Sequence, residues 1–310
     1  MKKTLTLLAL TISFSVNAQM VDNSHPSNNF AEPNSVAMGY GTTASGDYST
    51  AMGRYTTASG NVSIAMGYGT TASGDYSTAM GRYTTASGDY STAMGNGTEA
   101  SGSRSTAMGN GTIASGSRST AMGSGTIASA SRSTAMGTNT TASDYASLVI
   151  GQYNSSGSSV TNSATAYNTA NTAFVIGNGT SGSLSDAFKV MFNGDTTVSN
   201  DLTVSGDVVI SSDARLKSNI VSLGSTLPKL LQIDGKSYEM KGKQKIGVLA
   251  QEIQEVFPEL VTEDDNEMLA VNYQGLVPIL INALKEQDKI IKNQEERLNR
   301  IENLLLKLND

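Results

Sequence analysis

The sequence predicts a mainly β chain: a β-roll (solenoid) of short repeats, a β-rich stalk, and an α+β domain that ends in a coiled-coil helix. Met-Gly recurs every fourteen residues from Met38 to Met136, and Ile150-Gly151 continues the phase. The Gly/Ser/Thr-rich composition stops at Ser212, where the chain becomes charged and non-repetitive. The last segment has the 3-4 apolar spacing of a coiled-coil seam.

The N-terminus predicts export. Lys2 and Lys3 precede an apolar run, and Val16-Asn17-Ala18 places a small residue before Gln19, as in a secretory signal peptide spanning residues 1–18. The run is shorter than the ~20 residues that a membrane span needs, and no other segment is apolar enough, so no transmembrane anchor is expected. We expect residues 19–34 to be flexible and the mature protein to be secreted or held at the cell surface.

Composition excludes several function classes. The net charge is −6, which makes nucleic acid an unfavourable partner. The chain has no cysteine, which excludes disulfides and thiolate metal sites. The single histidine, His25, stands in a polar stretch and is given no role. No metal or cofactor is predicted.

Residues 35–151 predict a stack of coils. Fourteen residues can form two short strands and two turns, and the glycines after Met and after Ala-Ser supply permissive backbone at the turns. Coils stacked ~4.8 Å apart place equivalent residues in ladders. Ala and Met predict a thin interior that is too small to stabilise one chain, which a trimer sharing its inner faces would remedy.

The variable positions of the repeat fit such ladders. Tyr and Arg alternate after Met-Gly, in the order Tyr40, Arg54, Tyr68 and Arg82, which permits cation–π contact between neighbouring coils. Another position holds Arg104, Arg118 and Arg132 on successive coils. These three side chains either fan out into solvent, which is the simpler interpretation, or form a basic strip for an acidic glycan or surface.

The repeat unit, roughly Ser-Thr-Ala-Met-Gly-x-x-Thr-x-Ala-Ser-Gly-x-x, resembles the head repeats of trimeric autotransporter adhesins. Met replaces the isoleucine of that family in the first eight copies, and Ile150 restores it. The resemblance covers residues 35–151. It implies a trimeric, left-handed parallel β-roll.

Residues 152–211 predict a β-rich stalk that is interwoven between three chains. The expected strands are residues 174–177, 188–192, 196–198, 202–204 and 208–210. Asn193-Gly194-Asp195 is a strong turn signal between two of them.

Residues 212–310 predict a compact α+β module. We expect a hairpin of residues 236–240 and 245–249 around Lys241-Gly242, a helix over 251–257 stopped by Pro258, and strands at 260–262 and 268–273. The acidic turn 263–266 could bind calcium, but its spacing matches no standard loop and favours a solvated turn. A coiled coil is expected over 276–310, and its seam is Leu284, Gln287, Ile291, Gln294, Leu298, Ile301, Leu305 and Leu308.

This region resembles the intramolecular chaperone domain of phage tailspikes and tail fibres, the S74 peptidase family. The residues that carry the resemblance are Ser212-Asp213-Ala214-Arg215-Leu216-Lys217-Ser218-Asn219-Ile220, Ile246 to Ile253, Phe257 to Val261 and Val271-Asn272-Tyr273.

The resemblance implies a domain that aligns three chains and then acts once as an autocatalytic serine endopeptidase. Ser212 would be the nucleophile and Lys217 the general base, and the bond between Ser211 and Ser212 would break. Asp213 and Arg215 would support the site. A serine hydroxyl needs such an adjacent base at neutral pH.

The leading hypothesis is therefore an exported, homotrimeric, fibre-like surface or adhesion protein whose head binds an unknown receptor or glycan. The alternative is a structural solenoid with an inactive chaperone tail, or an ice-binding one. The ice-binding version rests on a complete threonine column: Thr42, Thr56, Thr70, Thr84, Thr98, Thr112, Thr126 and Thr140. A glycan-cleaving spike is disfavoured, because Asp47, Asp75 and Asp89 lack an obvious carboxylate partner.

Overall fold

The computed structural model describes residues 29–30, 34–155, 157, 163–264 and 267–309. These residues form two compact units, one ending at Gly206 and the other beginning at Asp207. The expected signal peptide and His25 lie outside the described residues. No helix among the described residues is long and apolar enough to cross a membrane.

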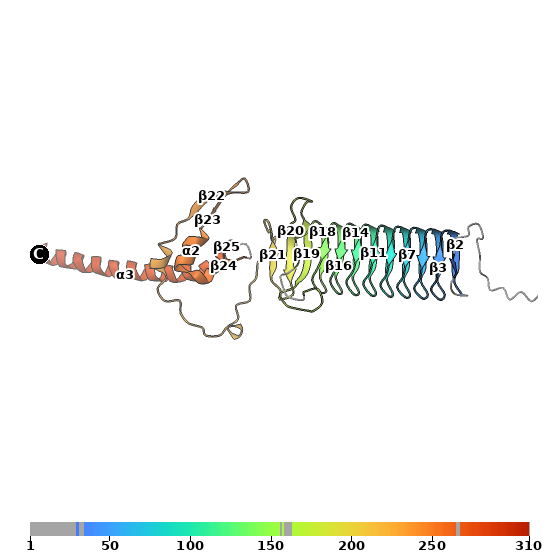
Figure 1. The fold of residues 1–310 in the computed structure, drawn as a ribbon. Coiled ribbons are helices and arrows are strands. Elements are labelled where there is room, and N and C mark those ends of the chain that lie inside the picture. The colour runs from blue at the N-terminus through green and yellow to red at the C-terminus, as the bar shows by residue number, and fades with distance from the viewer. Residues whose placement is uncertain (1–28, 31–33, 156, 158–162, 265–266, 310) are drawn as a thin grey trace, which may run out of the picture. The chain divides into compact units, whose positions relative to one another are not determined.

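The first unit is a solenoid of stacked coils, as the repeat predicts (Figure 1). Each fourteen-residue coil contributes one long and one short strand, and each strand pairs in parallel with its equivalent one coil away, as Met94 does with Met108. The long strands are β2 (Val36–Tyr40), β4 (Thr50–Arg54), β6 (Ile64–Tyr68), β8 (Thr78–Arg82), β10 (Thr92–Asn96), β12 (Thr106–Asn110), β14 (Thr120–Ser124), β16 (Thr134–Thr138) and β18 (Leu148–Gln152). The short strands are β1 (Asn29–Phe30), β3 (Thr43–Ala44), β5 (Thr57–Ala58), β7 (Thr71–Ala72), β9 (Thr85–Ala86), β11 (Glu99–Ala100), β13 (Ile113–Ala114), β15 (Ile127–Ala128) and β17 (Thr141–Ala142).

One short strand departs from expectation. β1 falls within the segment expected to be flexible, yet it pairs in parallel with β3. The pairing extends the sheet of short strands by one more strand beyond the repeats. Residues 19–28 and 31–33 lie outside the described part of the chain.

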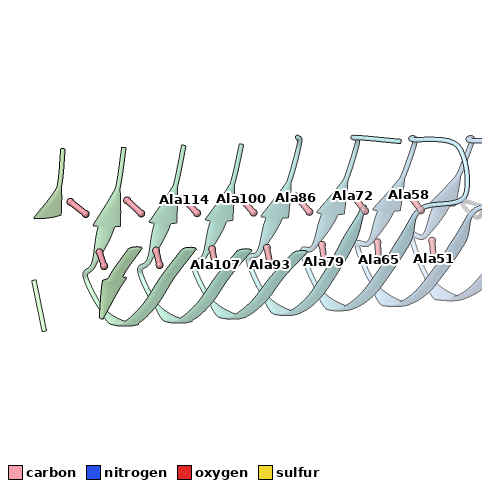
Figure 2. Packing of buried hydrophobic residues seen from close by; sticks show 14 of the residues in the cluster. Ala51, Ala58, Ala65, Ala72, Ala79, Ala86, Ala93, Ala100, Ala107 and Ala114 are labelled. Carbon is pink, nitrogen blue, oxygen red and sulfur yellow. The ribbon is translucent and has the colours of Figure 1, made fainter. Parts of the chain in front are cut away.

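The interior is built from small side chains. Two rows of fully buried alanines face each other between the two sheets (Figure 2). Serine and threonine fill the remaining inward positions of each coil, as Ser91 and Thr98 do. The prediction that alanine lines a thin interior is therefore confirmed.

Two expected orientations are wrong. The methionines alternate with buried alanines along each long strand and lie, partly exposed, on the outer face, as in β10. The threonine column from Thr42 to Thr140 points inward and is fully buried, so it cannot present a face to ice. Successive side chains along a strand point to opposite faces of the sheet. The repeat length alone does not say which of the two alternating sets faces inward, and this is why both orientations were predicted wrongly.

The long sheet continues beyond the repeats. β18 pairs in parallel with β19 (Thr172–Asn178), which pairs antiparallel with β20 (Asp186–Met191), and β20 pairs with β21 (Thr196–Val198). The strands expected at 202–204 and 208–210 are absent, and their apolar side chains are exposed. Nothing in the described part of the chain offers these residues a paired edge or a covering face.

The second unit is a small α+β domain. Hairpin β22 (Lys236–Met240) and β23 (Lys243–Gly247) turns at Lys241-Gly242, where both residues have positive φ. The second strand thus begins two residues earlier than expected. The other elements are η1 (Ala214–Leu216), α1 (Leu227–Leu230), α2 (Ala250–Val256), η2 (Pro258–Leu260), β24 (Val261–Glu263), β25 (Leu269–Val271), η3 (Tyr273–Gly275) and α3 (Leu276–Asn309).

The core of this unit is small. Ile253, Phe257 and Leu260 from the α2–η2 region pack on Ile279 of α3. Beyond this contact α3 runs on with its apolar side chains in solvent, and Leu298 and Leu305 are each more than half exposed.

Candidate functional site

A short turn brings the predicted nucleophile and base together. Asp213 caps η1 by accepting a hydrogen bond from the backbone N–H of Arg215, 2.8 Å away. The turn closes when the N–H of Lys217 donates to the carbonyl of Ala214 at 3.1 Å. Because this 3₁₀ turn reverses the chain, Lys217 Nζ donates to Ser212 Oγ at 2.8 Å although the residues are five apart.

The two supporting residues pair with each other. The Arg215 guanidinium donates two hydrogen bonds to the Asp213 carboxylate, from Nη2 to Oδ2 at 2.7 Å and from Nε to Oδ1 at 3.0 Å. This contact holds the pKa of the Asp213 carboxyl below its ordinary value. The two charges pair on the surface, next to Ser212.

The turn is fully open to solvent in the single chain. Ser212 and Lys217 are both exposed, and so are the apolar neighbours Leu216, Ile220 and Val221. A lysine serves as a general base only where burial or nearby cations favour its neutral form. The pair therefore has hydrogen-bonding geometry, and both side chains lie in solvent in the single chain.

Glu286 makes a structural contact that sequence reasoning missed. Its carboxylate reaches from α3 to the start of α1, where it accepts hydrogen bonds from Ser225 Oγ at 2.7 Å and from the N–H of Thr226 at 2.5 Å. These bonds lower its pKa. Ser225-Thr226-Leu227-Pro228 could have indicated this contact. The segment starts a helix whose first turn has no acidic residue of its own, so a carboxylate from elsewhere can accept its N–H groups.

The head presents aromatic and cationic side chains at its two corners. After Met-Gly, the Arg54 guanidinium lies 5.0 Å from the ring centre of Tyr55 and 5.6 Å from that of Tyr68, which confirms the expected cation–π contacts. At the other corner, after Ala-Ser-Gly, Tyr76 and Tyr90 stack in parallel with ring centres 4.9 Å apart.

The acidic column at this second corner has a structural role. Asp75 Oδ1 accepts the N–H of Asn61 at 2.8 Å, and Asp89 Oδ1 accepts the N–H of Asp75 at 3.1 Å. Each carboxylate thus ties its coil to the preceding one. The two aspartates lie in one column and bond to backbone N–H groups. They therefore do not face each other across a cleft, as the two carboxylates of a glycosidase do.

Comparison with known families identifies both kinds of module. Residues 33–56 and 58–154 match the YadA head domain repeat in seven overlapping or adjacent segments, and residues 212–262 match the Peptidase_S74 family, described as chaperone of endosialidase. The chain therefore combines adhesin-type head repeats with a segment that matches a chaperone domain.

Two curated relatives come from bacteriophages. The long tail fiber protein Gp37 of Enterobacteria phage K3 is 35% identical over 95 residues, which covers 27% of this chain and 8% of the relative. The protein of the same name from Enterobacteria phage T2 is also 35% identical over 95 residues, covering 27% of this chain and 7% of the relative. The chain thus spans less than a tenth of either relative.

Proposed function

We propose that this chain is an exported, homotrimeric surface fibre whose C-terminal domain guides assembly and then cleaves the Ser211–Ser212 bond. The observation that carries the proposal is the 2.8 Å hydrogen bond between Lys217 Nζ and Ser212 Oγ. Both residues lie in the segment that matches the Peptidase_S74 family, whose name denotes a peptidase and whose description denotes a chaperone. Adhesin-type repeats and tail-fibre relatives support a location outside the cell, where such fibres act.

Two uncovered apolar surfaces support the trimer. The first is the methionine ladder on the long strands of the head, which comprises Met38, Met52, Met66, Met80, Met94, Met108, Met122 and Met136. The second is the exposed seam of α3. A partly exposed apolar ladder and a solvated coiled-coil stripe both gain stability when identical chains cover them.

The cleavage step is an attack on the adjacent carbonyl. Ser212 Oγ bonds to the carbonyl carbon of Ser211 while Lys217 accepts the hydroxyl proton. Lys217 then gives this proton to the Ser212 nitrogen as the C–N bond breaks, which leaves Ser211 as an ester on Ser212 Oγ and frees the amine of Ser212. Water hydrolyses the ester, so Ser211 ends in a carboxylate and Ser212 becomes a new N-terminus.

Assembly would switch this step on. Partner chains that cover Leu216, Ile220 and Val221 would also desolvate the neighbouring Lys217. Burial favours the neutral amine, which is the form that accepts a proton. Cleavage would then follow trimerisation and release the chaperone from a fibre that has already folded.

The test is a gel of the expressed chain under denaturing conditions. Ser212→Ala should remain full-length because the nucleophile is lost, whereas Ser211→Ala should still be cut at this border. Lys217→Arg keeps the positive charge but cannot act as a base near neutral pH, so it should also remain full-length. Processing of Ser212→Ala at this border would refute the assignment.

A further inference from the structure

Three arginines form a regular ladder at the second corner of the head. Arg104, Arg118 and Arg132 are exposed and share a left-handed backbone, with φ of 59°, 58° and 61°. Their backbone N–H groups bond to the preceding coil at 2.7–2.8 Å, so the three residues repeat with the coil rise of ~4.8 Å. We call these three residues the arginine ladder.

Folding does not require arginine at this position. In earlier coils the same column holds Tyr48, Val62, Tyr76 and Tyr90, in the same left-handed conformation. A like-charged ladder is unfavourable for the fold, since each guanidinium lies one coil from the next. The arginines therefore suit a role outside the solenoid's own stability.

The neighbouring column changes at the same coil. Asp89 precedes Tyr90, but Ser103 precedes Arg104, and serine again precedes Arg118 and Arg132. Acidic side chains thus disappear where the basic ones begin. Among the described residues, no ion pair involves any member of the arginine ladder.

Aromatic rings bound the arginine ladder at both ends. The Arg104 guanidinium lies 5.3 Å from the ring centre of Tyr90, and that of Arg132 lies 5.2 Å from the ring centre of Tyr145. Arg132 also donates a hydrogen bond to the Tyr145 hydroxyl. These contacts reduce the freedom of two guanidinium groups and set a ring face beside each charge.

We propose that the arginine ladder binds a linear acidic polysaccharide that lies along the solenoid axis. Its carboxylate or sulfate groups would each accept paired N–H donors from a guanidinium, and its sugar rings would pack against Tyr90 and Tyr145. This inference deepens the proposed surface-fibre function and rests on it, because it assigns a ligand class to the head.

Other anionic partners fit less well. A long, stiff polyanion such as duplex DNA would extend beyond three coils onto the column of Asp75 and Asp89, which would repel it. The head of a second copy offers the column of Asp75 and Asp89 as a poor counterpart, because oxygens of these carboxylates already accept backbone N–H groups. A sugar chain is more flexible than duplex DNA, so it can contact three coils and then turn away, and it meets neither obstacle.

The experiment measures binding of the full chain to immobilised heparin and polygalacturonate at several salt concentrations, with dextran as the neutral comparator. The test variant is the double change Arg104→Tyr and Arg118→Tyr, because tyrosine occupies this column in three earlier coils. The control is Arg54→Asn and Arg82→Asn at the other corner, where Asn96 and Asn110 occupy the same column. Both variants remove two positive charges.

We expect salt-sensitive binding to both acidic polymers and none to dextran. The test variant should bind about tenfold more weakly or worse, and the control within about twofold of the parent. Equal losses in both variants, no binding to either acidic polymer, tighter binding to duplex DNA, or salt-sensitive self-association that the test variant abolishes would each overturn the proposal. Native mass and processing are read on the same samples, so a trimeric, processed fibre that fails to bind refutes the ligand and leaves the fibre function standing.

Discussion

At the residue scale, carboxylates close the turns on which the C-terminal domain depends. Asp213 caps η1 and pairs with Arg215, which sets the loop that carries Ser212 and Lys217. Glu286 does the same from a distance, since it ties α3 to the first residues of α1. Both carboxylates have lowered pKa values because hydrogen bonds favour their charged forms.

The lowered pKa of Glu286 predicts an acid-sensitive domain. Its stabilising effect is present above the ordinary glutamate value of about 4.3 and is lost as pH falls through the lower folded value. Glu286→Gln should have a lower thermal unfolding temperature than the parent at neutral pH. The difference between the two unfolding temperatures should be smaller near pH 3. Melting curves in the uncleavable Ser212→Ala background measure this.

The control for that prediction is Glu302→Gln, an exposed glutamate farther along the same helix. It should change little at either pH. An unfolding temperature of Glu286→Gln that matches the parent at neutral pH would contradict the assigned role.

The sequence could predict the residue pair of the candidate site but not its surroundings. Ser212 and Lys217 stand in an ordered motif, and a tight turn is a local property that needs few distant contacts. Glu286 could not be predicted, because it meets Thr226 only after α3 folds back on α1, sixty residues away in sequence. On the proposed mechanism, the environment that activates Lys217 would come from neighbouring chains, which one sequence does not describe.

At the element scale, glycine permits the coils to stack. Gly95 has a φ of +130°, and a Cβ there would lie 1.9 Å from the carbonyl oxygen of Gly109. Gly97 also has positive φ, at +62°, but a Cβ there would meet nothing within 4 Å. Gly95 is therefore required both by its positive φ and by the close approach of the next coil, whereas Gly97 is required by its positive φ alone.

Substitution at these two glycines tests the stacking. Gly97→Ala should cost ~1 kcal/mol, because alanine tolerates the left-handed region poorly. Gly95→Ala should cost several times more, since the neighbouring coil must move away. Urea unfolding followed by circular dichroism measures both. Similar losses at the two positions would show that stacking is looser than described.

The pairing of equivalent residues in successive coils followed from the repeat, because a strict period fixes which residues are equivalent. The inward or outward direction of each side chain did not, and Met94 and Thr98 show this: the apolar residue lies outside and the polar one inside. Small volume, rather than hydrophobicity, selects the interior residues of so thin a coil. The strands expected at 202–204 and 208–210 failed because alternation alone provides no pairing partner.

At the scale of the whole molecule, the chain leaves three apolar surfaces partly or fully exposed. The methionine ladder lies on the head, Leu216 and Val221 flank the candidate site, and the seam of α3 is solvated. One assembly would account for all three surfaces. It would also cover the hydrogen-bonded Ser212–Lys217 pair, which is exposed to solvent in the single chain.

The number of chains in the uncut particle tests this directly. Ser212→Ala keeps every copy joined to its C-terminal helix, and native mass spectrometry then reports how many copies associate. We predict a particle of three chains. A folded single chain, with its C-terminal helix intact, would contradict the account.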